Sequence, residues 1–432
     1  MKLKGLKIKM NEEFLSKTAC GAVWASVSTD TMGRLRPCCT INSVITDSKG
    51  EPYKIDRIGD LERFWHSDTM REIRKAGLEN RWHKLCFKCE QQENGGSFSQ
   101  RLLYVHLLEK VRFSKKSNPD SVIPNIKMLN LLLSNKCNMK CRMCSPKNSH
   151  LIGRESKTHN LSDIWGNDVW GKDQTSTYSE PVSIDDDAMI ELVEAYHESI
   201  DEIQFAGGEP FLSDTQYLIL KKLVDLGVSD KITITYNTNG TIPMDQYYEL
   251  WSKFKKVSLS VSLEAVGDLA NYIRYPTNWD NINRVMKSLD LVSNNIIQVK
   301  VNCLVQALNV LRLREFMEWL YQYDNICRIP SFSTLVLPKH QHIRNIPIEL
   351  REESASNLKN FMETHDLNSD RGKIIWPYRW YKSRMKKTIH YIKNEPDAIN
   401  TTEFIKFNTT LDRVRKLDLF AVLPELNGYY KI

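Results

Sequence analysis

The sequence predicts an α/β protein whose central strands run mostly parallel. From Ile126 onward, short apolar runs rich in Val, Ile and Leu recur at intervals of a few tens of residues. The segments between them carry apolar residues at helical spacing, which is typical of crossover helices between parallel strands. A third observation is the crowding of cysteines before residue 145, which indicates metal-binding parts beside this core. We therefore expect an α/β core that is closed or partly closed as a barrel.

Length and composition exclude several classes of protein. The chain has 432 residues, of which 41% are hydrophobic and 26% charged, which argues against disorder and against a coiled coil. A net charge of +7 is mild at this length, so it does not by itself indicate a nucleic acid or membrane partner, and it leaves acidic substrates open. No apolar run is long enough to span a membrane, and the start of the chain leads into charged sequence. We expect a cytoplasmic protein that does not contact the membrane.

Six segments of the core combine β-branched residues with turn signals at their ends and are predicted as strands. They are Met128–Ser134, Glu202–Phe205, Ile232–Tyr236, Val257–Leu263, Ile297–Leu304 and Ser331–Leu337. Helices are predicted at Ser183–Ser199, capped by Ser183, and at Asp214–Leu226, capped by Ser213 and closed by Gly227. Functional residues are expected at the carboxyl ends of the strands.

Changes in pattern along the chain suggest three parts. Residues 1–120 hold two cysteine pairs and little periodicity, residues 121–340 hold the α/β core, and residues 341–432 form a helical, basic extension. Within the extension, Arg371 to Lys393 carries eight Lys or Arg residues. The polar stretch from Arg154 to Pro181, with Trp165 and Trp170, has no clear period and is predicted as an inserted loop.

Three cysteines follow the first predicted strand of the core. Cys137, Cys141 and Cys144 stand in a C-x-x-x-C-x-x-C loop. Thiolates are soft ligands that suit iron–sulfur clusters or zinc, and three of them leave one iron of a cubane open. A zinc site would need a fourth ligand, and the nearest histidine, His150, lies outside the loop. The loop therefore favours an iron–sulfur cluster with one open iron.

This loop resembles the defining motif of the radical S-adenosylmethionine (radical SAM) superfamily. The resemblance implies a partial (β/α)6 TIM-like barrel, a 4Fe-4S cluster held by the three cysteines, and S-adenosylmethionine bound at the open iron. Reductive cleavage of S-adenosylmethionine would then give a 5′-deoxyadenosyl radical that abstracts hydrogen from a substrate. Met143 stands where the family often has an aromatic residue near the adenine, so it is a candidate cofactor contact.

A glycine turn supplies a second motif. Gly207, Gly208, Glu209 and Pro210 follow the second predicted core strand, and glycines let the backbone approach a ligand closely. The turn resembles the family's G-G-E-P motif, which implies that it holds the methionine amino group.

Weaker candidates follow later strands. The resemblance implies that a serine of the fourth strand, Ser260 with Ser262 beside it, contacts ribose and that Arg274 pairs with the methionine carboxylate. Asn237, at the end of the third strand, is a further candidate for cofactor binding. Each of these residues also fits a strand-end cap or a surface ion pair.

The N-terminal cysteines form a second candidate metal site. Cys20, Cys38, Cys86 and Cys89 make two separated pairs, which suits tetrahedral zinc or a fully ligated four-iron cluster. The C-x12-G-x4-C spacing from Cys20 to Cys38 resembles the start of the auxiliary-cluster domains called SPASM and twitch, which implies an auxiliary 4Fe-4S cluster. In that family the domain usually follows the barrel, whereas here it precedes it. Cys39 adjoins Cys38 and is the alternative ligand, while Cys303 and Cys327 are predicted to be buried thiols.

The leading hypothesis is a radical SAM oxidoreductase that acts on a peptide or protein and receives electrons from a flavodoxin or ferredoxin. A small metabolite or an RNA is the alternative substrate. A hypothesis of another class is a zinc-stabilised nucleic-acid-binding protein, because the segment Ile374–Lys382 interleaves aromatic and basic residues.

Overall fold

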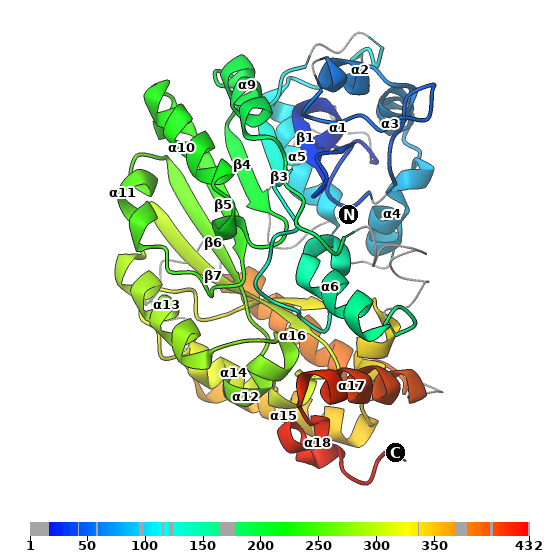
Figure 1. Cartoon of the computed structure of the whole chain (residues 1–432), viewed down its shortest axis with the longest axis vertical. Coiled ribbons are helices and arrows are strands. Elements are labelled where there is room, and N and C mark those ends of the chain that lie inside the picture. The colour runs from blue at the N-terminus through cyan, green and yellow to red at the C-terminus, as the bar shows by residue number, and fades with distance from the viewer. Residues whose placement is uncertain are drawn as a thin grey trace. The chain divides into compact units, whose positions relative to one another are not determined.

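The computed structural model describes residues 17–430 apart from 42, 58, 95–98, 115, 121–123, 165–177, 336, 366, 368–377 and 398–400 (Figure 1). Eight strands in these residues are mostly parallel, which confirms the α/β prediction. The chain divides into two compact units. One unit comprises residues 1–135, 182–236 and 253–255, and the other comprises residues 136–181, 237–252 and 256–432. The domain boundaries expected at residues 120 and 340 stay predictions.

The strands of the first unit begin with two that were not predicted. They are β1 (Ser26–Thr29), β2 (Leu35–Arg36), β3 (Met128–Leu132), β4 (Glu202–Ala206) and β5 (Thr233–Thr238), whose last two residues belong to the second unit. The spatial order is β2-β1-β3-β4-β5, with β1 antiparallel to β2 and all other neighbours parallel. The N-terminal segment therefore extends the parallel strands of the core through β1.

The helices of the first unit are α1 (Ala22–Ala25), α2 (Asp60–Trp65), α3 (Asp68–Leu78), α4 (Phe87–Asn94), α5 (Gln100–Lys110), α9 (Asp186–Tyr196) and α10 (Thr215–Asp225). Two of them, α9 and α10, begin one or two residues away from their predicted caps. The N-cap of α9 is Asp185 and not Ser183, because the Asp185 carboxylate accepts a hydrogen bond from the Ala188 amide at 2.9 Å. The N-cap of α10 is Asp214 and not Ser213. Figure 1 shows α9 beside α10.

The strands of the second unit are β6 (Lys256–Ser262), β7 (Ile297–Val305) and β8 (Ser331–Thr334), which are parallel. In their register Ser260 pairs with Lys300, and Asn302 pairs with both Ser262 and Ser331. Burial alternates along β7, so that Val299 and Val301 are buried while their neighbours are half-buried. One face of these strands is therefore apolar core and the other is polar.

The helices of the second unit are α6 (His150–His159), α11 (Tyr248–Trp251), α12 (Gly267–Ile273), α13 (Trp279–Val292), α14 (Leu313–Leu320), α15 (Ile348–Thr364), α16 (Tyr378–Asn394), α17 (Thr402–Arg415) and α18 (Leu419–Val422). The prediction of an inserted loop from Arg154 to Pro181 is wrong at its start, because α6 continues to His159. Trp165 and Trp170 lie outside the described residues, as does Ile374–Pro377. The extension after residue 341 is helical, as expected. Among the described residues, no helix combines the length and the apolar character that a membrane crossing requires.

Candidate functional site

The three-cysteine loop follows β3 and folds back on itself. The Cys144 amide donates to the Cys141 carbonyl at 3.0 Å, which closes a turn between the two cysteines. Cys137 and Cys141 are buried and pack with Met139, while Cys144 and Met143 lie half-buried against them. Within the described residues, no three Cys, His, Asp or Glu side chains form a preassembled metal site. The three thiols lie in one short segment, and their donor set suits an iron–sulfur cluster.

The loop is attached to the segment that follows α12. The Lys140 amide donates to the Tyr275 carbonyl at 2.5 Å, and the Arg142 amide donates to the Ile273 carbonyl at 2.9 Å. These two hydrogen bonds attach Lys140 and Arg142, two residues apart in the loop, to the segment Ile273–Tyr275. Cys141 lies between these two anchored residues, so the bonds fix the backbone on both sides of it.

Arg274, the candidate partner of the methionine carboxylate, lies beside the loop and pairs with a protein carboxylate in this structure. Its guanidinium bonds both oxygens of Glu264, and its Nη1 lies 3.6 Å from Cys141 Sγ. Burial raises the pKa of Cys141 above its ordinary value, and the positive charge of Arg274 opposes this shift. Burial, with Cys141 nearby, raises the pKa of Cys144 to about 12. A bound cation would offset the cost of ionising these buried thiols.

A small cavity adjoins the loop. It measures about 240 Å³ with its open side included, and Met139, Asn239, Glu264 and Arg274 are among the residues that line it. Asn239 donates to Asn138 Oδ1 at 2.9 Å, and its Nδ2 lies 3.9 Å from Cys137 Sγ. Asn237 and Asn239 both precede Gly240 at the end of the third predicted strand, and the sequence favoured Asn237 for cofactor binding. Asn237 is half-buried, and Asn239 is the residue that reaches the loop.

The glycine turn after β4 requires a glycine at position 207. Gly207 has φ +122°, and a Cβ there would lie 2.6 Å from the Ser134 carbonyl oxygen. The Gly208 amide donates to that same oxygen at 2.7 Å, so the turn is pinned to the end of β3. Glu209 is buried and its carboxylate accepts from the Phe211 amide at 3.3 Å, and Pro210 begins a short 3-10 turn. The turn is therefore fixed against the end of β3, and its role in binding the methionine amino group stays a prediction.

The two serine candidates lie on one face of β6. Ser260 is buried and Ser262 is half-buried, and their spacing of two residues directs both side chains to the polar face. Both precede Glu264 and Arg274 along the same chain segment.

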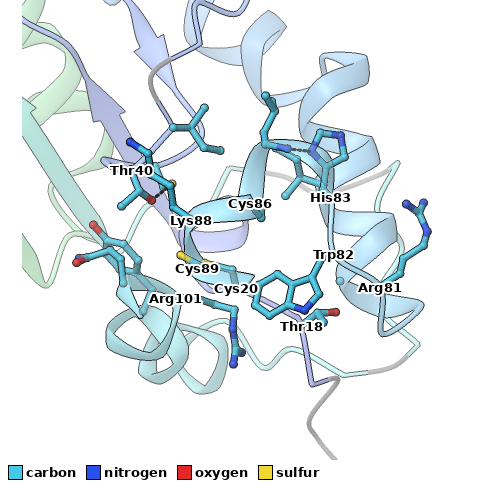
Figure 2. Close-up of a pocket in the computed structure, with 17 residues that line it drawn as sticks. Thr18, Cys20, Thr40, Arg81, Trp82, His83, Cys86, Lys88, Cys89 and Arg101 are labelled. Carbon is cyan, nitrogen blue, oxygen red and sulfur yellow. Dashed lines mark hydrogen bonds between the residues drawn. The ribbon is translucent and has the colours of Figure 1, made fainter. Parts of the chain in front are cut away.

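The four N-terminal cysteines gather around one pocket (Figure 2). Cys20, Cys38, Cys86 and Cys89 all line it, and the pocket encloses about 540 Å³ with its mouth included. Cys20 precedes α1, Cys38 follows β2, and Cys86 and Cys89 lie at the start of α4. Cys39 does not line the pocket, because its Sγ lies 3.4 Å from the Tyr104 hydroxyl instead.

The thiols of this pocket interact with one another. The pKa of Cys20 is raised well above its ordinary value. Burial is the larger cause, and the nearby Cys38 adds to it. Burial, with Cys38 and Cys89, raises the pKa of Cys86 to about 12. A cation bound in the pocket would offset both the burial of these thiols and the repulsion between their thiolates.

Arg101 forms part of the pocket wall. Its guanidinium lies 5.5 Å from the centre of the Trp82 ring, donates to Glu93 at 2.8 and 2.5 Å, and donates to the Ala19 carbonyl at 3.0 Å. These contacts fix the segments that carry Cys20 and Cys89. Cys303 and Cys327 are buried thiols, as predicted, and none of the ten cysteines forms a disulfide.

Residues 131–320 match the family model of the Radical SAM superfamily. Similar curated proteins include a GTP 3′,8-cyclase of Synechocystis, 22% identical over 51% of this chain and 58% of the relative. Another is the radical SAM cyclopropyl synthase TigE of Paramaledivibacter caminithermalis, 25% identical over 39% of this chain and 33% of the relative. The chain thus spans less than two thirds of the length of these relatives.

Solved structures with a similar arrangement include anSMEcpe with bound AdoMet, at 14% identity, a TM-score of 0.39 and coverage of 57% of this chain and 62% of that chain. A second is Streptococcus suis SuiB bound to precursor peptide SuiA, at 12% identity and a TM-score of 0.35. The match covers 67% of this chain and 64% of that chain. The sequence comparisons, rather than these structural ones, support the Radical SAM superfamily for this chain.

Proposed function

We propose that this chain, whose residues 131–320 match the Radical SAM superfamily, is an enzyme that cleaves S-adenosylmethionine reductively and abstracts hydrogen from a substrate. The observation that carries the proposal is the loop of Cys137, Cys141 and Cys144. It lies within the matched residues, follows a parallel strand, and offers three soft ligands and no fourth. When bound there, a 4Fe-4S cluster would supply the electron that breaks the carbon–sulfur bond.

The residues around the loop would tune and orient this chemistry. Arg274 Nη1 and Asn239 Nδ2 both face cysteine sulfurs, and N–H groups near cluster sulfurs raise the reduction potential. Gly207, Gly208 and Glu209 would receive the methionine amino group, and Ser260 with Ser262 the ribose. Arg274 would keep its Glu264 partner or exchange it for the methionine carboxylate.

The N-terminal pocket would hold an auxiliary 4Fe-4S cluster on Cys20, Cys38, Cys86 and Cys89. Support comes from four thiols lining one pocket and from the different placement of Cys39. Four protein ligands leave no open iron, which suits electron transfer. Structural zinc is the alternative occupant.

A peptide or protein is the first substrate class to test, and a small metabolite or RNA is the second. The name GTP 3′,8-cyclase of one relative keeps a nucleotide substrate open. A flavodoxin or ferredoxin would supply electrons. Clustered thiols that could hold metal are typical of a reducing compartment, so the cytoplasm is the expected location.

The test is anaerobic reconstitution with iron and sulfide, followed by iron counting and an assay for 5′-deoxyadenosine under reductant. The wild type is compared with a Cys137→Ala, Cys141→Ala, Cys144→Ala triple variant, and a Cys303→Ala variant serves as the control. We expect about eight irons per chain in the wild type and about four in the triple variant, with 5′-deoxyadenosine made only when the loop is intact. Zinc alone, without cleavage, would overturn the proposal and favour the zinc-stabilised nucleic-acid-binding protein.

A further inference from the structure

Helix α17 packs on the three-cysteine loop within the second unit. Cys144 lies against an apolar cluster that contains Phe407 and Leu411 of α17 and Ile152 of α6. Arg415 is four residues beyond Leu411, which places it on the same face of the helix. The face of α17 that carries Arg415 therefore lies toward the loop and helps to bury the candidate cluster ligands.

Arg415 is joined to the loop by two salt bridges that share Glu155 of α6. Arg415 Nη2 lies 2.6 Å from Glu155 Oε2, and Nζ of Lys140, in the loop itself, lies 2.6 Å from Glu155 Oε1. Both cations also lie against the Tyr275 ring, whose centre is 5.3 Å from the Arg415 guanidinium and 5.0 Å from Lys140 Nζ. These four side chains form one connected group beside Cys141, which directly follows Lys140.

This group carries one net positive charge. Burial opposes the ionisation of Glu155, but the hydrogen bonds and charges of Arg415 and Lys140 hold the pKa of Glu155 below its ordinary value, so the acid is ionised. One carboxylate thus faces two cations. The Arg415 side chain is fully buried, and its Nη1 has no hydrogen-bond partner among the described residues. Burial raises the pKa of Cys141, and the charge of Arg415 is among those that oppose this shift.

Two further arginines at the loop are each matched by one acid. Arg142 pairs with Asp412, and Arg274 pairs with Glu264. The unmatched charge among these residues therefore belongs to the group of Arg415. Since that group is buried, water screens its charge less than it would at the surface.

We propose that Arg415 raises the reduction potential of the 4Fe-4S cluster held by the three-cysteine loop. Reduction adds a negative charge to the cluster, and a buried positive charge nearby stabilises the reduced form. Arg415 is a positioning residue, because it acts through the charge around the loop and does not touch the reacting atoms. The inference rests on the function proposed above, which assigns the cluster to this loop.

The test is a redox titration of the reconstituted full-length protein, followed by electron paramagnetic resonance. The signal of the loop cluster is the one that the triple loop variant lacks. Arg415→Gln removes the cation, Glu155→Gln removes the acid, and Arg415→Lys keeps the positive charge. Arg413→Gln serves as the control, because Arg413 is exposed on the same helix.

We expect opposite shifts in the two neutralising variants. At the midpoint potential of the wild type, the ratio of reduced to oxidised loop cluster should fall about tenfold in Arg415→Gln and rise about tenfold in Glu155→Gln. Arg415→Lys and Arg413→Gln should stay close to the wild type. A general loosening of the loop would shift both neutralising variants in the same direction, so shifts of the same sign, or no shifts, would overturn the inference.

Glu155→Gln decides the question by itself if Arg415→Gln does not retain its cluster. A potential in Glu155→Gln at or below that of the wild type would then overturn the role of Arg415. The same preparations separate this inference from the proposed function. A wild type without a loop-cluster signal would overturn both, whereas a wild type that has the signal and makes 5′-deoxyadenosine, with unshifted variants, would overturn only the role of Arg415.

Discussion

Arg142, in the middle of the three-cysteine loop, forms a buried ion pair with Asp412 of α17, 270 residues further along the chain. The Nη2 to Oδ1 distance is 2.5 Å, and the Arg142 side chain is fully buried with its guanidinium 3.7 Å from the centre of the Tyr272 ring. The same guanidinium donates to the carbonyl of Asn408. The C-terminal extension is thus tied to the loop that carries the candidate cluster ligands.

Replacing Asp412 by Ala should destabilise the second unit. The change leaves the Arg142 charge buried without its acid, which typically costs about 3 kcal/mol or more. Denaturant unfolding of the full chain measures the loss, and Glu403→Gln, an exposed acid of the same helix, serves as the control. We also expect less iron bound after reconstitution, because the loop loses its anchor. An Asp412→Ala variant with wild-type stability would contradict this role of the pair.

Replacing Gly207 by Ala should disturb the turn after β4. The added Cβ would lie 2.6 Å from the Ser134 carbonyl oxygen, and the residue has a positive φ. Together these effects should cost about 2–4 kcal/mol of unfolding free energy. Gly227→Ala is the matched control, because Gly227 also has a positive φ but no atom within 4 Å of its Cβ position, so only about 1 kcal/mol is expected. Equal losses in the two variants would show that the close approach is unimportant.

The core strands could be predicted because their β-branched runs are long and lie between turn signals. β1 and β2 could not, since they have four and two residues and are stabilised by pairing with β3 and with each other. Helix caps were misplaced by one or two residues because neighbouring Ser and Asp residues compete for the same amides, and only the backbone decides between them.

Spacing and residue type made the cysteines of both candidate sites predictable, whereas most contacts around the loop were not. The spacing of Cys137, Cys141 and Cys144 is local, so it was visible at once. The contacts of Asn239 with Cys137 and of Arg142 with Asp412 join residues 102 and 270 positions apart. Nothing in local spacing encodes such pairs, because they arise from the packing of whole elements.

Cys38 and Cys39 should differ in metal binding. Cys38 lines the pocket with Cys20, Cys86 and Cys89, whereas Cys39 faces the Tyr104 hydroxyl. Cys38→Ser should therefore lose the metal of the N-terminal site, and Cys39→Ser should keep it. The readout is metal per chain in the background of the triple loop variant, where only the N-terminal site remains. Loss of metal in Cys39→Ser with retention in Cys38→Ser would reverse the assignment.

His340 should make the second unit sensitive to mild acid. Its ring stacks on Phe407 with the ring centres 4.0 Å apart, and burial lowers the pKa of His340 to about 4. A histidine in the unfolded chain titrates near pH 6.5, so between about pH 6.5 and pH 4 the unfolded state takes up a proton that the folded state does not. Stability contributed by the neutral ring is therefore present above pH 6.5 and is lost as the pH falls.

The expected loss between pH 7 and pH 5 is about 2 kcal/mol of unfolding free energy from this residue. Other groups titrate over the same interval, so the measurement is the difference between wild type and His340→Gln, each unfolded by denaturant at both pH values. The variant should be less stable than the wild type at pH 7, because it loses the stacking on Phe407, and should lose less stability on acidification. Parallel losses in the two proteins would mean that the His340 ring takes up its proton while folded, which its burial against Phe407 opposes.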